Sequence, residues 1–165
     1  QHYAFASGDE SADWIIIGHS PEPFNGIGHE PFAGEAGELL NNMMTAVGFD
    51  NPRQQTYMVN IQDINQVSDT SSNDDVKKEL NQKLTSIIHK IKPKLVLLVG
   101  QIAAQNLLNS EDPLIVLRSK AYQLTEDKIP CVVTYYPSYL LQKPIDKRKA
   151  WNDLKLAMSL LTDVS

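Results

Sequence analysis

The stretch TYYPSYLLQKP, residues 134–144, holds some of the residues of this chain that are best placed to do chemistry. A polar turn, Tyr136-Pro137-Ser138, directly follows the apolar run 130–133, and functional loops of α/β proteins follow strands in this way. The hydroxyl of Tyr136 can donate a hydrogen bond, but with an ordinary pKa of about 10 it is a poor proton shuttle near neutral pH. A tyrosine that only packs is the alternative, and the sequence leaves both open.

Two further residues could bind a planar ligand. Phe32 could stack on a ring such as a nucleobase. Asn60 ends a predicted strand, where its amide offers a donor and an acceptor to the edge of a base. Each also has a structural interpretation, because Phe32 could anchor its loop and Asn60 could cap one.

Four residues of the segment 19–30 carry side chains that could bind a metal ion: His19, Glu22, His29 and Glu30. Their spacing matches no established metal motif. The sequence therefore predicts solvated loop residues and no metal site.

The elements that must position these residues follow from the apolar patterns. Apolar runs predict core strands over 14–17, 57–61, 95–99 and 131–135, and 122–124 could add an edge strand. Helical spacing predicts helices over 35–47, 75–91, 101–108 and 147–161, with loops over 19–34 and 62–74. This alternation predicts an α/β fold: a three-layer αβα sandwich with a central, mainly parallel four-stranded sheet.

Ligands of such sheets bind outside the carboxyl ends of the strands. The loops after Gly18, around Asn60 and after Tyr135 should therefore form one pocket. Beyond it, Lys143, Lys147 and Arg148 form a local basic cluster that could contact the DNA backbone, or could simply be solvated.

Composition sets the limits. The chain has 165 residues, 42% hydrophobic and 21% charged, which fits one domain spanning 1–165. Gln1 is not a natural initiator, so the domain could lack a segment that precedes it. The net charge of −5 argues against an obligate non-specific DNA binder. No apolar run approaches the roughly 20 residues that span a bilayer, and no signal peptide is visible, so we expect a cytoplasmic protein. Cys131 is the one cysteine, so we expect no cofactor and no cluster made by this chain alone.

Several segments, taken in order, resemble the uracil-DNA glycosylase superfamily, closest to its bacterial iron–sulfur (family 4) branch. The family's Gly-Glu-Ala-Pro-Gly is matched by GHSPE (18–22), and its Gly-x-Pro-Phe-x-Gly-x-Ala-Gly-x-Leu-Leu by EPFAGEAGELL (30–40). Its asparagine strand is matched by YMVNIQDI (57–64), and its Ile-x-Pro-Lys segment by IKPKLVLLVGQIAAQNLL (91–108). Its Thr-Tyr-His-Pro-Ser-Ala-Leu-Leu is matched by TYYPSYLL (134–141), and its Lys-Arg-x-x-Trp-x-Asp-Leu-Lys by KRKAWNDLKLA (147–157).

The resemblance implies a pocket in which Phe32 stacks on a flipped uracil and Asn60 reads its edge, with Pro137 and Ser138 beside them. The family's motif glutamate falls on His19, and the glycine that closes that motif falls on Glu22. The histidine that supports charge on the departing uracil falls on Tyr136. The family's cluster cysteines after the asparagine strand and in the next helix have no counterpart here.

Recognition residues are thus kept while chemical residues are replaced, which leaves two interpretations. In the first, the chain is a catalytically degenerate member that serves as a DNA replication or repair accessory or interaction subunit. The psi subunit of the bacterial clamp loader looks like a precedent, with the chi subunit and the clamp loader as candidate partners. In the second, it is a divergent DNA glycosylase for uracil or another deaminated base, in which Tyr136 donates and His19 acts as a base.

Overall fold

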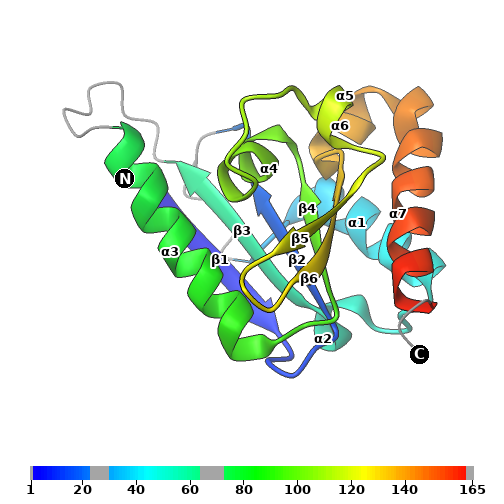
Figure 1. The fold of residues 1–165 in the computed structure, drawn as a ribbon. Helices are drawn as coiled ribbons and strands as arrows, with labels where there is room; N and C mark the ends of the chain where they lie inside the picture. The colour runs from blue at the N-terminus through cyan, green and yellow to red at the C-terminus, as the bar shows by residue number, and fades with distance from the viewer. Residues whose placement is uncertain (1, 23–29, 64–72, 163–165) are drawn as a thin grey trace.

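The four predicted core strands lie side by side as the centre of a larger sheet (Figure 1). The computed structural model describes residues 2–22, 30–63 and 73–162. Its sheet has six strands in the order β1-β3-β2-β4-β6-β5. Their bounds are β1 (His2–Gly8), β2 (Trp14–His19), β3 (Tyr57–Asp63), β4 (Leu95–Val99), β5 (Ala121–Leu124) and β6 (Ile129–Thr134).

The prediction of four strands is wrong, because an antiparallel strand is added at each edge. The inner strands β3, β2, β4 and β6 are all parallel to their neighbours, as predicted. At one edge β5 pairs with β6, as the stretch 122–124 suggested, and at the other β1 pairs with β3. The apolar stretch of β1, Tyr3-Ala4-Phe5-Ala6, is half alanine, which is a weak strand signal, and its partner strand lies about 55 residues further along the chain.

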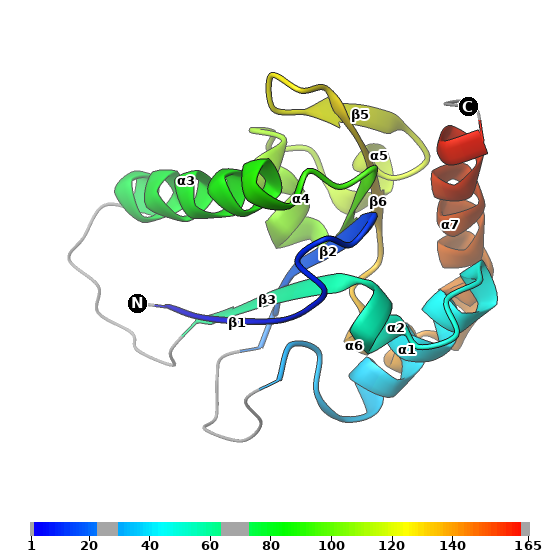
Figure 2. The same ribbon diagram turned by 90° about the horizontal axis from the view of Figure 1, so that it is seen from below.

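Helices cover both faces of the sheet, which gives the three predicted layers (Figure 2). On one side lie α3 (Asn73–Ile91) and α4 (Gln101–Leu107), and on the other lie α1 (Gly34–Val47) and α7 (Lys147–Thr162). Short elements connect them: α2 (Pro52–Gln55), α5 (Leu114–Leu117), α6 (Pro137–Gln142) and η1 (Pro144–Asp146). No helix among the described residues is both long and apolar enough to cross a membrane.

Alternate residues of the strands point to opposite faces of the sheet and pack in two separate hydrophobic cores. Ile15 and Ile17 of β2 pack under α3 and α4, whereas Trp14 and Ile16 pack under α1 and α7. Because side chains of a strand alternate between faces, a strand that is covered on both sides must be apolar throughout. This explains why the core strands could be read from unbroken apolar runs.

A buried ion pair joins the segment after α5 to α7 and β6. The guanidinium of Arg118 donates to both carboxylate oxygens of Asp153, at 3.1 and 3.0 Å, and the Thr134 hydroxyl donates to the same carboxylate at 2.8 Å. Asp153 is only 1% exposed. Burial raises the pKa of its carboxyl, while the hydrogen bonds from Thr134 and Arg118 act in the opposite direction. This network fixes α7 against the strand that leads to Tyr136.

Two sequence interpretations need correction at the carboxyl ends of the strands. Asn60 does not end its strand, because β3 continues to Asp63 along β1, which places Asn60 opposite Phe5 and Gly18. The segment that begins at Pro137 is helical and not a loop. Tyr136 is the residue before α6, and a proline at the first helical position suits a helix start because it has no N–H to leave unpaired.

Candidate functional site

Two glycines make room for two aromatic rings at the carboxyl ends of β2 and β4. A Cβ on Gly18 would lie 2.8 Å from the ring of Phe32, and a Cβ on Gly100 would lie 3.1 Å from the Cβ of Tyr136. Gly100 also has a φ of +98°, a conformation that suits glycine. The rings of Phe32 and Tyr136 meet with centroids 5.9 Å apart and planes tilted by 45°.

Asn60 faces the same space, and its amide is engaged by Tyr136. The Tyr136 hydroxyl donates to Asn60 Oδ1 at 3.2 Å, and the two residues are 8% and 3% exposed. They lie 76 positions apart in the sequence, so only the register of the sheet and the start of α6 bring them together. The structure thus joins Phe32, Asn60 and Tyr136 in one buried cluster at the predicted place.

Burial is the main influence on the acidity of Tyr136. It raises the pKa of the phenol above its ordinary value, and the negative charge of Glu22 acts in the same direction. Hydrogen bonds with Ser20 and Asn60 oppose this shift. The phenol is therefore a neutral hydrogen-bond donor near pH 7.

The Phe32 loop is held from behind by Arg53 of α2. The Arg53 guanidinium donates to the carbonyl oxygens of Pro31 at 2.7 Å and Phe32 at 2.6 Å. Phe32 has a φ of 54°, which is uncommon for a bulky residue and needs such support. Gly37 permits the close approach, since a Cβ there would collide with the Phe32 carbonyl oxygen.

His19 ends β2 and pairs with a residue that the sequence did not single out. Its Nε2 lies 2.9 Å from Oδ2 of Asp63, the last residue of β3. His19 is 8% exposed, and its Nδ1 is buried without a hydrogen-bond partner among the described residues. An imidazole held by a carboxylate in this way can accept a proton from a water or a donor.

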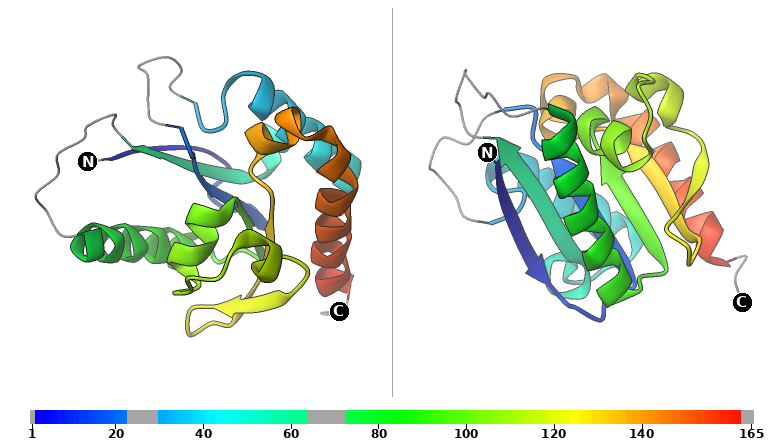
Figure 3. Two further views of the ribbon diagram at one scale, coloured as in Figure 1. Left: turned by 90° about the horizontal axis from the view of Figure 1, so that it is seen from above. Right: turned by 60° about the vertical axis from the view of Figure 1, so that its left-hand side comes forward.

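The remaining predicted residues follow Tyr136 along the chain, from α6 to the start of α7. Pro137 is buried and Ser138 half-buried, at the start of the helix. Lys143, Lys147 and Arg148 are exposed, between the end of α6 and the start of α7. Figure 3 shows α6 leading from the end of β6 to α7, so the basic residues follow the site directly along the chain.

Neither a metal nor a cluster is supported by the ligands that the structure describes. Among the described residues, no three His, Cys, Asp or Glu side chains gather around a possible metal position. His29 lies outside the described residues. Cys131 is fully buried in β6, and burial raises the pKa of its thiol strongly. One buried thiol does not fit a cluster that four thiolates hold.

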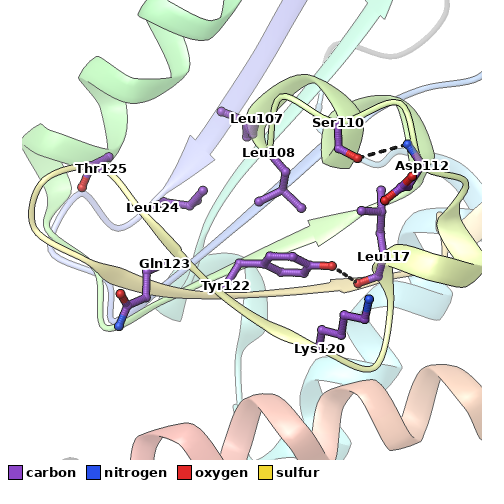
Figure 4. A pocket seen from close by; sticks show the side chains of 10 residues that line it. All are labelled: Leu107, Leu108, Ser110, Asp112, Leu117, Lys120, Tyr122, Gln123, Leu124 and Thr125. Carbon is purple, nitrogen blue, oxygen red and sulfur yellow. Dashed lines mark hydrogen bonds between the residues drawn. The ribbon is translucent and has the colours of Figure 1, made fainter.

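A cavity of about 420 Å³ lies apart from this site, between the segment after α4 and strand β5 (Figure 4). The Tyr122 hydroxyl donates to the Leu117 carbonyl oxygen at 2.8 Å along its wall. The cavity is lined by Leu107, Leu108, Ser110, Asp112, Leu117, Lys120, Tyr122, Gln123, Leu124 and Thr125. None of the residues predicted to bind a ligand is among them.

Sequence reasoning missed three contributors to the site. Asp63 is the last residue of β3, Arg53 lies in α2 just before that strand, and Gly100 follows β4. The available signals were a carboxylate at the polar end of an apolar strand for Asp63, and a glycine directly after an apolar strand for Gly100. Arg53 gave none, because its partners are backbone carbonyls more than 20 positions away.

The part of the chain that matches known proteins includes all the residues of this site. The family model described as "Uracil DNA glycosylase superfamily" matches residues 5–155. A type-4 uracil-DNA glycosylase from Archaeoglobus fulgidus is 23% identical over 160 residues, which cover 93% of this chain and 79% of that protein. Another from Pyrobaculum aerophilum is 24% identical over 151 residues, which cover 86% of this chain and 74% of that protein.

Proposed function

We propose a function that starts from one fact: this chain belongs to the uracil DNA glycosylase superfamily. Within that family it is a member that has lost base excision and acts as an accessory or interaction protein of DNA replication or repair. The observation that carries the proposal is the hydrogen bond from the Tyr136 hydroxyl to Asn60 Oδ1. This hydrogen bond occupies Asn60, which would read the base, and Tyr136, which stands in the place of the family's histidine.

The chemistry of excision explains why these contacts matter. Cleavage of the glycosidic bond leaves negative charge on the departing base, and a preorganised donor to such an anion contributes about 3–4 kcal/mol. Here the donor of Tyr136 already points at Asn60. His19, which stands in the place of the family's glutamate, is paired with Asp63. Glu22 adds a negative charge close enough to raise the pKa of Tyr136, and it would oppose an anion there.

An accessory role is the use that we assign to a fold without excision. The candidate partners are DNA, the chi subunit and the clamp loader of the bacterial replicase. Lys143, Lys147 and Arg148 are exposed and lie between the end of α6 and the start of α7, which supports contact with a DNA backbone. Titration of purified partners, and of DNA at several salt concentrations, tests both parts, since phosphate contacts weaken steeply with salt.

The excision test uses single-stranded and duplex DNA that contain uracil, with protein in excess over substrate. We expect the wild type to form no abasic sites under conditions in which an active uracil-DNA glycosylase, used as the positive control, does form them. The matched variant carries His19→Glu and Tyr136→His, which restores the family's residues, and its activity would show that these two positions are what was lost. Clear uracil release by the wild type would overturn the proposal.

One observation favours a divergent glycosylase as the second candidate. His19 Nδ1 is buried and free among the described residues while Asp63 holds Nε2, and this arrangement suits a general base. If the protein is such an enzyme, the wild type releases uracil and Asn60→Ala abolishes release, because base-edge hydrogen bonds are lost. Unchanged release by Asn60→Ala would remove Asn60 from the site.

We further propose that the protein works without an iron–sulfur cluster or another cofactor. The buried position of the Cys131 thiol in β6 supports this part of the proposal. Iron analysis and the visible absorption spectrum of protein purified without oxygen test it. Stoichiometric iron with the absorption of a cluster would contradict it.

A further inference from the structure

The sheet ends at β5, and the outer side of this strand has no partner strand among the described residues. In the order β1-β3-β2-β4-β6-β5, β5 pairs only with β6 (Figure 2). Gln123 lies opposite Pro130, which has no N–H to donate. That pair cannot exchange two hydrogen bonds, so the neighbouring residues Tyr122 and Leu124 are the ones that bond to β6. The backbone N–H and C=O groups of Ala121 and Gln123 therefore point to the open edge.

An open edge of this kind is a template for pairing with another strand. We propose that the β5 edge is an interaction surface for a second copy of this chain, with the two β5 strands antiparallel about a two-fold axis at Gln123. The two sheets then form one continuous sheet across a symmetric dimer. The inference is independent of the proposed function, because it uses no residue of the candidate site.

Two exposed charges of opposite sign indicate that the partner is a second copy. Lys120 and Glu126 lie three positions before and three positions after Gln123. Neither forms an ion pair with another described residue. In an antiparallel pair that is centred on Gln123, Lys120 of each copy faces Glu126 of the other copy, so two attractive contacts form. The edge is thus complementary to itself in charge, and opposite charges across two strands stabilise their pairing.

The backbone and the apolar side chains favour the same register. Directly opposite residues of an antiparallel pair either both exchange hydrogen bonds or both do not, so Gln123 has to face an outward-pointing residue. Gln123 that faces its own copy meets this condition. Tyr122 then lies opposite Leu124 of the other copy, which makes an aromatic–aliphatic pair. Both residues line the cavity of about 420 Å³ (Figure 4), so the second copy extends the apolar wall of that cavity.

The opposite edge of the sheet lacks these features. β1 pairs only with β3, and it contains no Lys, Arg, Asp or Glu. Register is weakly specified in a strand whose side chains do not select one pairing. Nothing in β1 therefore selects one arrangement of two copies, and this edge serves as the comparison surface in the test.

The experiment measures the dissociation constant of the dimer by sedimentation equilibrium. Lys120→Glu and Glu126→Lys each place like charges opposite one another in both contacts, and each should raise the dissociation constant about tenfold. A mixture of these two variants restores opposite charges in both contacts, so it should dimerise as tightly as the wild type. The matched controls are Lys90→Glu and Glu10→Lys, which reverse an exposed pair 3.5 Å apart elsewhere on the protein and should leave the constant unchanged.

A second variant tests the backbone contacts. Gln123→Pro removes an outward N–H and leaves the hydrogen bonds with β6 in place, so it should abolish the dimer while the monomer stays folded in urea unfolding. In the wild type, amide exchange at Ala121 and Gln123 should slow as the protein concentration rises, because pairing protects those groups. If Gln123→Pro does not fold, the charge reversals at two exposed side chains carry the test.

Three results would each overturn the inference. One is a wild type that stays monomeric up to about 1 mM. Another is a dimer that neither charge reversal weakens, or a mixture of the two variants that associates no better than each variant alone. The third is exchange that slows with concentration in β1 and not in β5, which would place the contact at the opposite edge.

Discussion

The hydrogen bond between Tyr136 and Asn60 should be measurable as an interaction energy between two residues that are 76 positions apart. The perturbation is a double-mutant cycle: Tyr136→Phe removes the donor, Asn60→Leu removes the acceptor, and the double variant removes both. Each single variant loses the hydrogen bond, and so does the double variant. The energy of the bond is therefore the difference between the sum of the two single destabilisations and the destabilisation of the double variant. A bond that contributes nothing would leave the two changes additive.

The magnitude follows from the burial of both partners. Tyr136→Phe leaves Asn60 Oδ1 buried without this donor, and an unsatisfied buried acceptor costs about 1–3 kcal/mol. The net contribution of a neutral hydrogen bond is smaller, about 0.5–1.5 kcal/mol. We therefore expect a coupling energy of about 1 kcal/mol, while Tyr136→Phe alone destabilises by somewhat more.

The assay is urea unfolding followed by the fluorescence of Trp14 and Trp151, with equal slopes required across the four proteins. The matched control is Tyr135→Phe, which removes a hydroxyl from the adjacent buried tyrosine and should be additive with Asn60→Leu. A coupling below about 0.3 kcal/mol at Tyr136 would refute the reasoning, because separate sites already add to within that margin.

Three further predictions follow from the same structure. Burial raises the pKa of Tyr136 above 10.0, so above about pH 10 the folded protein keeps a proton that the unfolded chain releases. The free energy of unfolding should therefore fall as the pH rises beyond about 10. The urea midpoints at about pH 9 and pH 11 should differ less in Tyr136→Phe than in the wild type. Arg53→Ala should cost about 2–3 kcal/mol and speed proteolysis near Phe32, while Arg53→Lys recovers only part because an ammonium lacks the two-pronged geometry. Arg118→Met should cost about 3–5 kcal/mol in urea unfolding because it leaves the Asp153 carboxylate buried and unpaired, and Arg118→Met with Asp153→Asn should recover much of that loss.

The core of the fold could be predicted because both faces of the sheet are covered. Residues 95–99, for example, are apolar throughout, and all five are buried in β4. The outer strands lacked this signal. β1 has a single neighbouring strand, and its short apolar stretch at residues 3–6 is half alanine, which is a weak strand signal. Its existence depends on pairing with β3, which no local pattern encodes.

The candidate site was predictable in position and unpredictable in detail. The carboxyl ends of β2, β3 and β6 meet at one edge, so Phe32, Asn60 and Tyr136 were expected to share a pocket. Which atoms meet is set by tertiary geometry: Gly100 leaves room for the Tyr136 side chain at the end of β4, and the start of α6 aims the phenol at Asn60. The pairing of His19 with Asp63 depends likewise on β3 continuing beyond Asn60, which the sequence did not indicate.

Asn60 and Tyr136 are best understood as a pair and not as one retained and one replaced residue. A buried amide oxygen needs a donor, and Tyr136 supplies it from inside the fold. An asparagine at this position is therefore explained by folding alone, without any base to read. Placing a histidine at Tyr136 replaces the phenol, which reaches Asn60 Oδ1 and packs against Phe32, by a shorter imidazole, so the variant should lose stability and gain space at the site together. A stability loss that free uracil reverses would mark the same residues as both the structural pair and the ligand site.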